Sequence, residues 1–260
     1  MKVTLISHTP DPEKLVATTA RLCYSNSDIE NIRDGLTDEK TKSFIDMLVS
    51  VGHESVMEHV SFTFGIEGIS RACSHQLVRH RIASYSQKSQ RYVNENGFDF
   101  ITPPAIKEIP EALEEYNKMI SEISESYSRI ADILTEYHKN ELMKNGLDEK
   151  TATSKARKTA NEDARFILPN ACETKIIVTM YVRSLFNFFR HRCCNRAQWE
   201  IRDVANEMLK LCLQVAPNIF GHAGASCVVE GKCPEGKMSC GKMAQVKADF
   251  EKLKGESKNA

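Results

Sequence analysis

The residues best suited to chemistry in this 260-residue chain lie in one basic stretch, Gln76–Tyr92. Five basic side chains fall within thirteen residues of it, and no acidic residue stands between the first and the last: Arg79, His80, Arg81, Lys88 and Arg91. The partner of this charge must therefore come from outside the segment. Guanidinium groups interleaved with serine and glutamine suit a phosphate or an anionic ring better than a lone carboxylate. A solvated basic loop is the alternative interpretation.

A second polar cluster is the segment His53–His59, which reads H-E-S-V-M-E-H. Two histidines and two glutamates in seven residues raise the question of a metal site. Metalloproteases need two histidines one helical turn apart, and this order lacks that spacing. We therefore expect a polar turn that lines a ligand pocket.

Three cysteines near the C-terminus, Cys227, Cys233 and Cys240, lie among glycines and lysines. His222 or Cys212 would complete a zinc tetrahedron, but the gaps are wider than the usual C-x2–4-C spacing. We predict no metal centre, although a zinc site, a disulfide or redox pair, and free thiols all stay open. The nine cysteines are odd in number, which favours buried thiols or metal ligands over a disulfide framework.

The composition sets limits on the class of protein. Lys plus Arg and Asp plus Glu both number 35, so no global field draws the chain to nucleic acid or to a membrane. No signal-peptide pattern and no apolar run of membrane length occur, and we expect a cytoplasmic location.

Hydrophobic periodicity indicates the elements that must position these residues. Strands are expected at Lys2–Ile6, Val60–Ile66, Phe98–Thr102 and Thr174–Val182, the last of them buried. Helices are expected at Asp11–Cys23, from an N-cap at Thr37 to Gly52, from an N-cap at Ser70 to the basic stretch, at Ser184–Cys193, and from Ala197 to Pro217. Asn187 is a polar residue in an apolar helix, so it either bonds backbone or meets a ligand.

The clearest helix carries an apolar seam from Leu113 to Tyr137, about four heptads long. It packs either within the chain or across a subunit interface. Gly146 ends this helix, Asp148 starts another helix, and alanines recur every fourth residue from Ala152 to Ala164.

No Gly-x-Gly-x-x-Gly follows a strand, so a Rossmann site is not supported. The fold class is α/β (α+β), with a mixed or antiparallel sheet and long helices.

Arg79-His80-Arg81 followed by Ser89 resembles the RHR-x7-S signature of the flavin-dependent thymidylate synthases. Four further segments resemble that family in its own order: G-H-E-S-V-M-E-H, R-F-I-L-P, V-R-S-L-F-N-F with its following arginine, and A-Q-W-E-I-R. Together they cover roughly residues 1–217. We expect a catalytic domain of residues 1–225 and a Cys/Lys-rich C-terminal tail of residues 226–260.

The resemblance implies reductive methylation of dUMP to dTMP in dTTP biosynthesis. The carbon donor would be 5,10-methylenetetrahydrofolate, the hydride carrier FAD and the reductant NADPH. It also implies a homotetramer with active sites between subunits.

By the same resemblance, each site residue has an expected role. Residues expected to bind dUMP are Gln76, Arg79, Gln87, Lys88, Ser89, Gln90, Arg91, Arg165 and Arg192. Residues expected to bind FAD are His53, Ser55, Glu58, Arg79, His80, Arg81, Ile82, Arg183 and Asn187. Arg192 is the expected catalytic residue, which polarises the uracil ring, and Arg190 is its register-shifted competitor. Gln87 stands where the family often has glutamate, and Tyr181 replaces an asparagine-like flavin contact.

Two functions from other classes compete with this interpretation. A nucleic-acid-binding module would use the stretch from Arg79 to Arg91, but zero net charge argues against it. The second competing function is that of a non-catalytic flavoprotein or nucleotide-binding regulator.

Ser89 has no base beside it and is better interpreted as a phosphate ligand than as a nucleophile. Cys193 and Cys194 are interpreted as packing residues.

Overall fold

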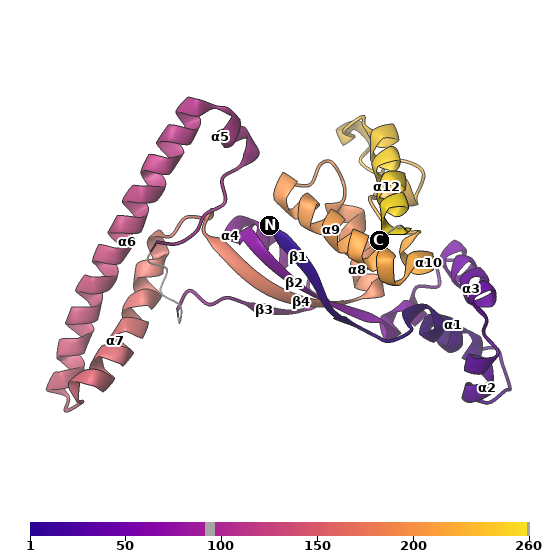
Figure 1. The fold of residues 1–260 in the computed structure, drawn as a ribbon, viewed down its shortest axis with the longest axis horizontal. Coiled ribbons are helices and arrows are strands. Elements are labelled where there is room, and N and C mark those ends of the chain that lie inside the picture. Colours follow the sequence, from indigo (N-terminus) through magenta and orange to yellow (C-terminus); the bar gives the residue numbers. More distant parts are fainter. Residues whose placement is uncertain (92–96, 259–260) are drawn as a thin grey trace. The chain divides into compact units, whose positions relative to one another are not determined.

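The computed structural model describes the backbone of residues 1–91 and 97–258, so Tyr92 of the basic stretch lies outside the described residues. The chain divides into two compact units. The first comprises Met1–Glu67, Gln76–Ser86 and Ile176–Ala260, and the second comprises Gly68–His75 and Gln87–Lys175. Long helices and an antiparallel sheet confirm the predicted fold class (Figure 1).

The sheet has four strands in the order β1 (Lys2–His8), β2 (Ser61–Ser70), β4 (Glu173–Tyr181) and β3 (Ser84–Gln87). β1 pairs antiparallel with β2, and Leu5 lies opposite Phe64. The period-two pattern of β2 buries Phe62, Phe64 and Ile66 on one face, as predicted.

Two strand predictions need correction. Thr174–Val182 was expected to be a buried strand, but β4 buries one face only, and its Ile177 remains 46% exposed. Phe98–Thr102 is not a strand, because its described pairing is the isolated bridge Phe100↔Cys172. β3 is a strand that the sequence analysis missed. The side chains of β3 are polar on both faces of the strand, so its sequence lacks the alternation of apolar and polar residues that predicts a strand.

Around its part of the sheet, the first unit carries α1 (Pro12–Leu22), α2 (Ile29–Asp34), α3 (Asp38–Ser50), the 3-10 helix η1 (Ser55–His59), α8 (Val182–Arg192), α9 (Trp199–Val215) and α10 (Pro217–Phe220). Thr37 caps α3 as predicted, and its hydroxyl accepts from the Lys40 amide at 3.3 Å. Aromatic rings form much of the core, since the Phe220 ring contacts Phe62, Phe186 and Phe189.

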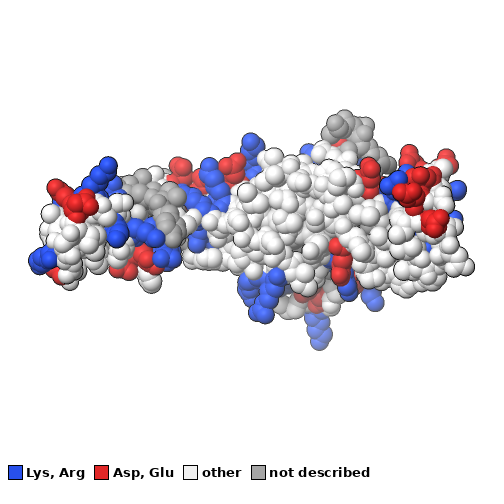
Figure 2. Space-filling model, turned by 90° about the horizontal axis from the view of Figure 1, so that it is seen from below, with Lys and Arg blue, Asp and Glu red and all other residues white. Residues whose placement is uncertain are grey.

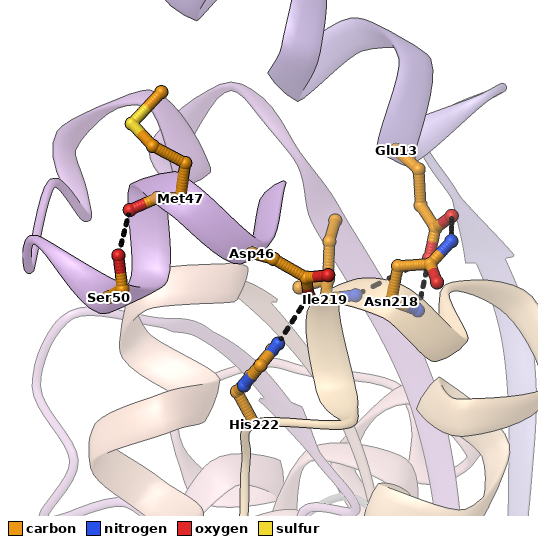
Figure 3. A network of polar contacts seen from close by, with 7 residues as sticks. All are labelled: Glu13, Asp46, Met47, Ser50, Asn218, Ile219 and His222. Carbon is orange, nitrogen blue, oxygen red and sulfur yellow. Dashed lines mark hydrogen bonds and ion pairs between the residues drawn. The ribbon is translucent and has the colours of Figure 1, made fainter. Parts of the chain in front are cut away.

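Polar contacts attach α10 to the N-terminal helices (Figure 3). The Glu13 carboxylate accepts from the Asn218 backbone amide at 2.7 Å and from the Asn218 side-chain amide at 2.6 Å. His222 Nε2 lies 2.9 Å from Asp46 Oδ1. His222 is thus paired with a carboxylate of α3.

The C-terminal tail is part of the first unit. It contains α11 (Ser226–Val229), the 3-10 helix η3 (Gly236–Met238) and α12 (Met243–Lys258). A solvated helix was one of the two outcomes expected for the final Lys- and Glu-rich segment. The helix is present, but it is not fully solvated, because Val246 and Phe250 are each only 8% exposed and α12 contacts α9 and α11.

The second unit is built on a helical hairpin, α6 (Pro110–Lys144) and α7 (Glu149–Ala164), which follows α5 (Pro104–Glu108) and precedes η2 (Arg165–Ile167) (Figure 1). Gly146 turns the chain at φ +87°. The Asp148 carboxylate then caps α7 by accepting from the Thr151 amide at 3.0 Å. The small alanine face of α7 allows close approach, and Tyr127 and Ala131 of α6 pack against Ala164. Part of the α6 seam is therefore used within the chain.

The basic stretch begins on α4 (Arg71–Leu77), whose predicted N-cap is present: the Cys73 amide donates to the Ser70 hydroxyl at 3.0 Å. Tyr85 of β3 holds the following turn, because its hydroxyl lies 2.9 Å from the Leu77 carbonyl and 2.7 Å from the His80 carbonyl. Burial raises the pKa of Tyr85 to about 12, so the hydroxyl remains a donor.

Candidate active site

The first unit contains a cavity of about 1420 Å³. It is lined by the turn after α4, by η1, by α8 and the loop that follows it, and by the C-terminal tail. Seven residues expected to bind flavin line it: Glu58, Arg79, His80, Arg81, Ile82, Arg183 and Asn187. Both arginines considered for catalysis, Arg190 and Arg192, line it as well. His53, Ser55 and Gln76 are not among the lining residues.

Arg192 is held by a histidine of the RHR signature. Its Nε donates to His80 Nε2 at 3.0 Å, and the His80 ring meets Phe188 edge-on with centroids 4.9 Å apart. Burial, then the charge of Arg192, then His191 lower the pKa of His80 from 6.5 to about 4. The imidazole is therefore neutral near pH 7, and it orients the guanidinium without cancelling its charge.

The other arginines of α8 that line the cavity are paired with carboxylates. Arg190 Nη2 donates to Glu54 Oε1 at 2.8 Å, and Arg183 Nη1 donates to Glu58 Oε1 at 2.6 Å. The hydrogen bond to Glu58 is the main cause that raises the pKa of Arg183. The segment H-E-S-V-M-E-H thus lines the cavity through its two glutamates, as a polar turn should. A role was predicted for Glu58 but not for Glu54.

Apolar and amide groups line the same cavity. Ile82 is 73% exposed and Tyr181 is 49% exposed, so both offer apolar surface to a ligand in the cavity. Asn187 is exposed as well, so its predicted apolar setting is wrong. On α8 this position faces the cavity, which leaves the side-chain amide available to a ligand.

Four thiols line the cavity, from Cys194 in the loop after α8 and from Cys227, Cys233 and Cys240 in the tail. All nine cysteines are free thiols in this structure. The pKa of Cys227 is raised, first by burial and then by the neighbouring thiols of the group. In the described part of the chain, no three His, Cys, Asp or Glu side chains come together as a potential metal site.

The two further ligands considered for such a site lie elsewhere. His222 pairs with Asp46, and Cys212 is fully buried on α9. Cys193 is buried as well, and burial strongly raises the pKa of its thiol. A protonated thiol is a poor nucleophile, which supports the interpretation of Cys193 as a packing residue.

The second unit holds most of the residues expected to bind dUMP. Arg91 makes a two-point contact with Glu162, since its Nε lies 2.9 Å from Oε1 and its Nη2 donates to Oε2 at 3.1 Å. The Arg91 amide donates to the Ser89 hydroxyl at 3.2 Å, and Arg165 Nε donates to the Glu162 carbonyl at 3.1 Å. Arg91 and Arg165 therefore both contact Glu162, and Ser89 contacts Arg91. Glu162 was not predicted from the sequence, because its carboxylate pairs with Arg91, which is 71 residues away.

Gln87 is engaged within the second unit. Its side-chain amide nitrogen lies 2.8 Å from the Ser74 hydroxyl and 3.2 Å from the Thr174 hydroxyl, and both partner residues are buried. A glutamate could not donate these two hydrogen bonds, which gives the glutamine a structural reason. Gln90 Nε2 lies 3.6 Å from Cys172 Sγ, and the Lys88 amide donates to the Lys175 carbonyl at 2.9 Å.

Charge on the face drawn in Figure 2 is mixed, with Lys and Arg side chains interspersed with Asp and Glu. This distribution agrees with the equal numbers of the two signs in the chain. Among residues 1–91 and 97–258, no helix is both long and apolar enough to cross a membrane.

Comparison with known proteins identifies relatives along almost the whole chain. Residues 4–218 match the family model described as thymidylate synthase complementing protein. A Clostridium tetani protein named flavin-dependent thymidylate synthase is 52% identical over 247 residues, which cover 95% of this chain and 96% of that protein. Proteins of the same name from Geobacter sulfurreducens and Nitratidesulfovibrio vulgaris are 48% and 44% identical. They cover 97% and 93% of this chain and 99% and 94% of their own.

Proposed function

The chain belongs to the flavin-dependent thymidylate synthase family, and from this premise we propose how its residues divide the work of that reaction. The enzyme converts dUMP to dTMP in dTTP biosynthesis and uses a flavin. In our proposal the flavin is FAD, NADPH reduces it, and 5,10-methylenetetrahydrofolate provides the carbon. The observation that carries the proposal is the cavity in which the RHR signature and Arg192 come together.

The residues of this cavity suit FAD. A volume of about 1420 Å³ exceeds that of ordinary small-ligand pockets, which are roughly 300–1,000 Å³. Arg79 and Arg81 are exposed to it and offer donors for a pyrophosphate. Ile82 and Tyr181 offer apolar cover for rings. Bound FAD would supply the hydride that completes the methyl group.

Arg192 is the proposed catalytic residue. The uracil ring gains negative charge during the reaction, and a fixed cationic donor stabilises such charge best when it is oriented in advance. The hydrogen bond to a neutral His80 provides that orientation. Arg190 suits the task less well, because Glu54 offsets its charge at 2.8 Å.

The remaining proposed roles concern the nucleotide. Ser89, Arg91 and Arg165 would hold its phosphate, helped by backbone amides between Gln87 and Gln90. Glu162 would orient Arg91 until the phosphate arrives. Gln87 would meet the ribose or base through its amide oxygen, since its nitrogen is already engaged. Gln76, Arg79 and Lys88 complete the proposed set, and His53 and Ser55 would contact FAD next to η1.

The assembly and the division of the chain also remain proposals. A homotetramer with active sites between subunits is supported by α6, on which Ile133 and Tyr137 are 68% and 62% exposed. The proposed catalytic domain, residues 1–225, is supported by the family match, which ends at residue 218. Residues 226–260 are then a separate C-terminal tail. A cytoplasmic location stays a prediction.

The test is direct. Purified protein should be yellow, carry about one flavin per chain, and form dTMP from dUMP when the folate and NADPH are supplied. Omission of the folate should abolish dTMP and leave the flavin in place. A colourless protein that FAD cannot reconstitute would contradict the proposal.

A further inference from the structure

The C-terminal tail forms one wall of the cavity that contains Arg192. The match to the family model ends at residue 218, before the tail begins. Yet Cys227, Cys233, Cys240, Met243 and Val246 all line the cavity. The tail is therefore part of the cavity, although it lies beyond the residues that the family model matches.

Contacts with the rest of the unit hold this wall in place. Arg196, in the loop after α8, donates through Nη1 to the Met238 carbonyl. The Ser226 hydroxyl donates to the Arg190 carbonyl at 3.3 Å, which attaches the tail to α8 itself. Val246 and Phe250 are buried, so α12 has an apolar anchor. These contacts make the tail a fixed surface of the cavity.

The two walls differ in chemistry. The turn after α4 and the end of α8 present Arg79, Arg81 and Arg192. The tail presents thiols, Met243 and Val246, and its charged lining residues are the acidic Glu230 and Glu235. Carboxylates repel a phosphate, whereas thiols and a thioether pack well against an aromatic ring.

We infer that the segment from Cys227 to Val246 is a binding element for the cofactor, which covers an uncharged ring of FAD while the arginine wall holds its phosphates. The inference rests on the proposed function, which supplies the ligand. It assigns the tail a role in flavin affinity and leaves the chemistry at the uracil ring to Arg192.

Thiol alkylation tests the contact between the tail and FAD without any substitution in the chain. The FAD-loaded and flavin-stripped forms are treated with N-ethylmaleimide, and the rate of modification is followed at each cysteine by peptide mass spectrometry. Cys233 and Cys240 should react about tenfold more slowly when FAD is bound, because a covered thiol is inaccessible to the reagent. Cys23 is exposed, is not among the lining residues, and should react equally in both forms.

A pair of variants of α12 gives a second measurement. Met243→Glu places a carboxylate against the expected ring and should weaken FAD binding about tenfold, measured by flavin fluorescence. Lys252→Glu makes a charge change on the same helix, where the side chain is 78% exposed and is not part of the lining, and should leave FAD affinity unchanged. Circular dichroism and thermal unfolding verify that both variants fold.

The two proposals fail in different ways. Equal alkylation of Cys233 and Cys240 in the loaded and stripped forms, or unaltered FAD affinity in Met243→Glu, would overturn the role of the tail. A wild-type protein that takes up no flavin would instead contradict the proposed function.

Discussion

Two arginines predicted to meet dUMP lie in different units, and each makes a hydrogen bond to an acceptor of a different kind. Arg192, in the first unit, donates to the neutral His80 at 3.0 Å. Arg91, in the second unit, is paired with the Glu162 carboxylate at 2.9 Å. A neutral acceptor orients a guanidinium without itself offsetting the charge, whereas a carboxylate orients it and offsets the charge.

This difference suggests different tasks. Charge that develops on a reacting ring needs a donor that is oriented and charged before the reaction begins. A phosphate clamp needs only an oriented arginine, because the phosphate dianion can replace the carboxylate as its partner. We therefore expect changes at Arg192 to affect turnover and changes at Arg91 to affect affinity.

The largest effect is expected from Arg192→Ala. The rate of dTMP formation at saturating dUMP should fall about 10³-fold, comparable to the loss of one preorganised donor in other enzymes. Flavin content should remain close to that of the wild type. Arg129→Ala, at an exposed position on α6, is the matched control and should retain full turnover. Near-normal turnover in Arg192→Ala would contradict the catalytic role of Arg192 and its difference from Arg91.

A substitution at His80 can test how the charge of this neighbour affects Arg192. His80→Glu places a carboxylate beside Arg192, and kcat should fall about 100-fold because the charge is offset. His80→Gln keeps a neutral acceptor and should lose much less activity. Equal kcat values for the two variants would show that the charge of the partner is unimportant.

Arg91→Ala should act mainly on affinity. The KM for dUMP should rise about 10- to 100-fold, the value of a charge-assisted phosphate contact. The effect on kcat should be smaller, and steady-state kinetics with varied dUMP separate the two. A fall in kcat at constant KM would show that Arg91, like Arg192, acts on turnover, and would contradict the proposed division of tasks.

The ionisation of His80 should be visible in the stability of the fold. Its pKa in the folded protein, about 4, lies below the ordinary value of 6.5, so the unfolded chain binds more protons between these values. The contribution of His80 to the free energy of unfolding is therefore fully present above pH 6.5 and is lost as the pH falls towards 4. Denaturant unfolding of the wild type and of His80→Gln across this window should converge at low pH. Parallel curves would contradict the burial of a neutral imidazole.

The smallest effect is expected at Glu58. Glu58→Gln removes the charge that faces Arg183, but these side chains are 52% and 54% exposed. Exposed ion pairs contribute about 0–1 kcal/mol, so the free energy of unfolding should change by less than about 1 kcal/mol. A loss of several kcal/mol on chemical denaturation would show that this pair supports the cavity more than its exposure suggests.

Local features of the fold were predictable because their interactions span few residues. The caps at Thr37 and Ser70 were predicted, and Asp148 was predicted to start a helix; each of the three side chains accepts from an amide three residues later. The long helix α6 followed from its apolar period. β3 was missed, since a strand that is polar on both faces is held by its neighbours in the sheet rather than by its own pattern.

The sequence by itself determined the class of fold, the family and the residue types available for the reaction. Only the tertiary structure decided which partner each arginine has. His80 and Arg192 are 112 residues apart, and Arg91 and Glu162 are 71 residues apart. The same holds for the tail, whose place at the cavity depends on packing against α9 and on contacts with α8. Spacing along a chain constrains only near neighbours, whereas the charge and orientation of a buried group depend on whatever folding places beside it.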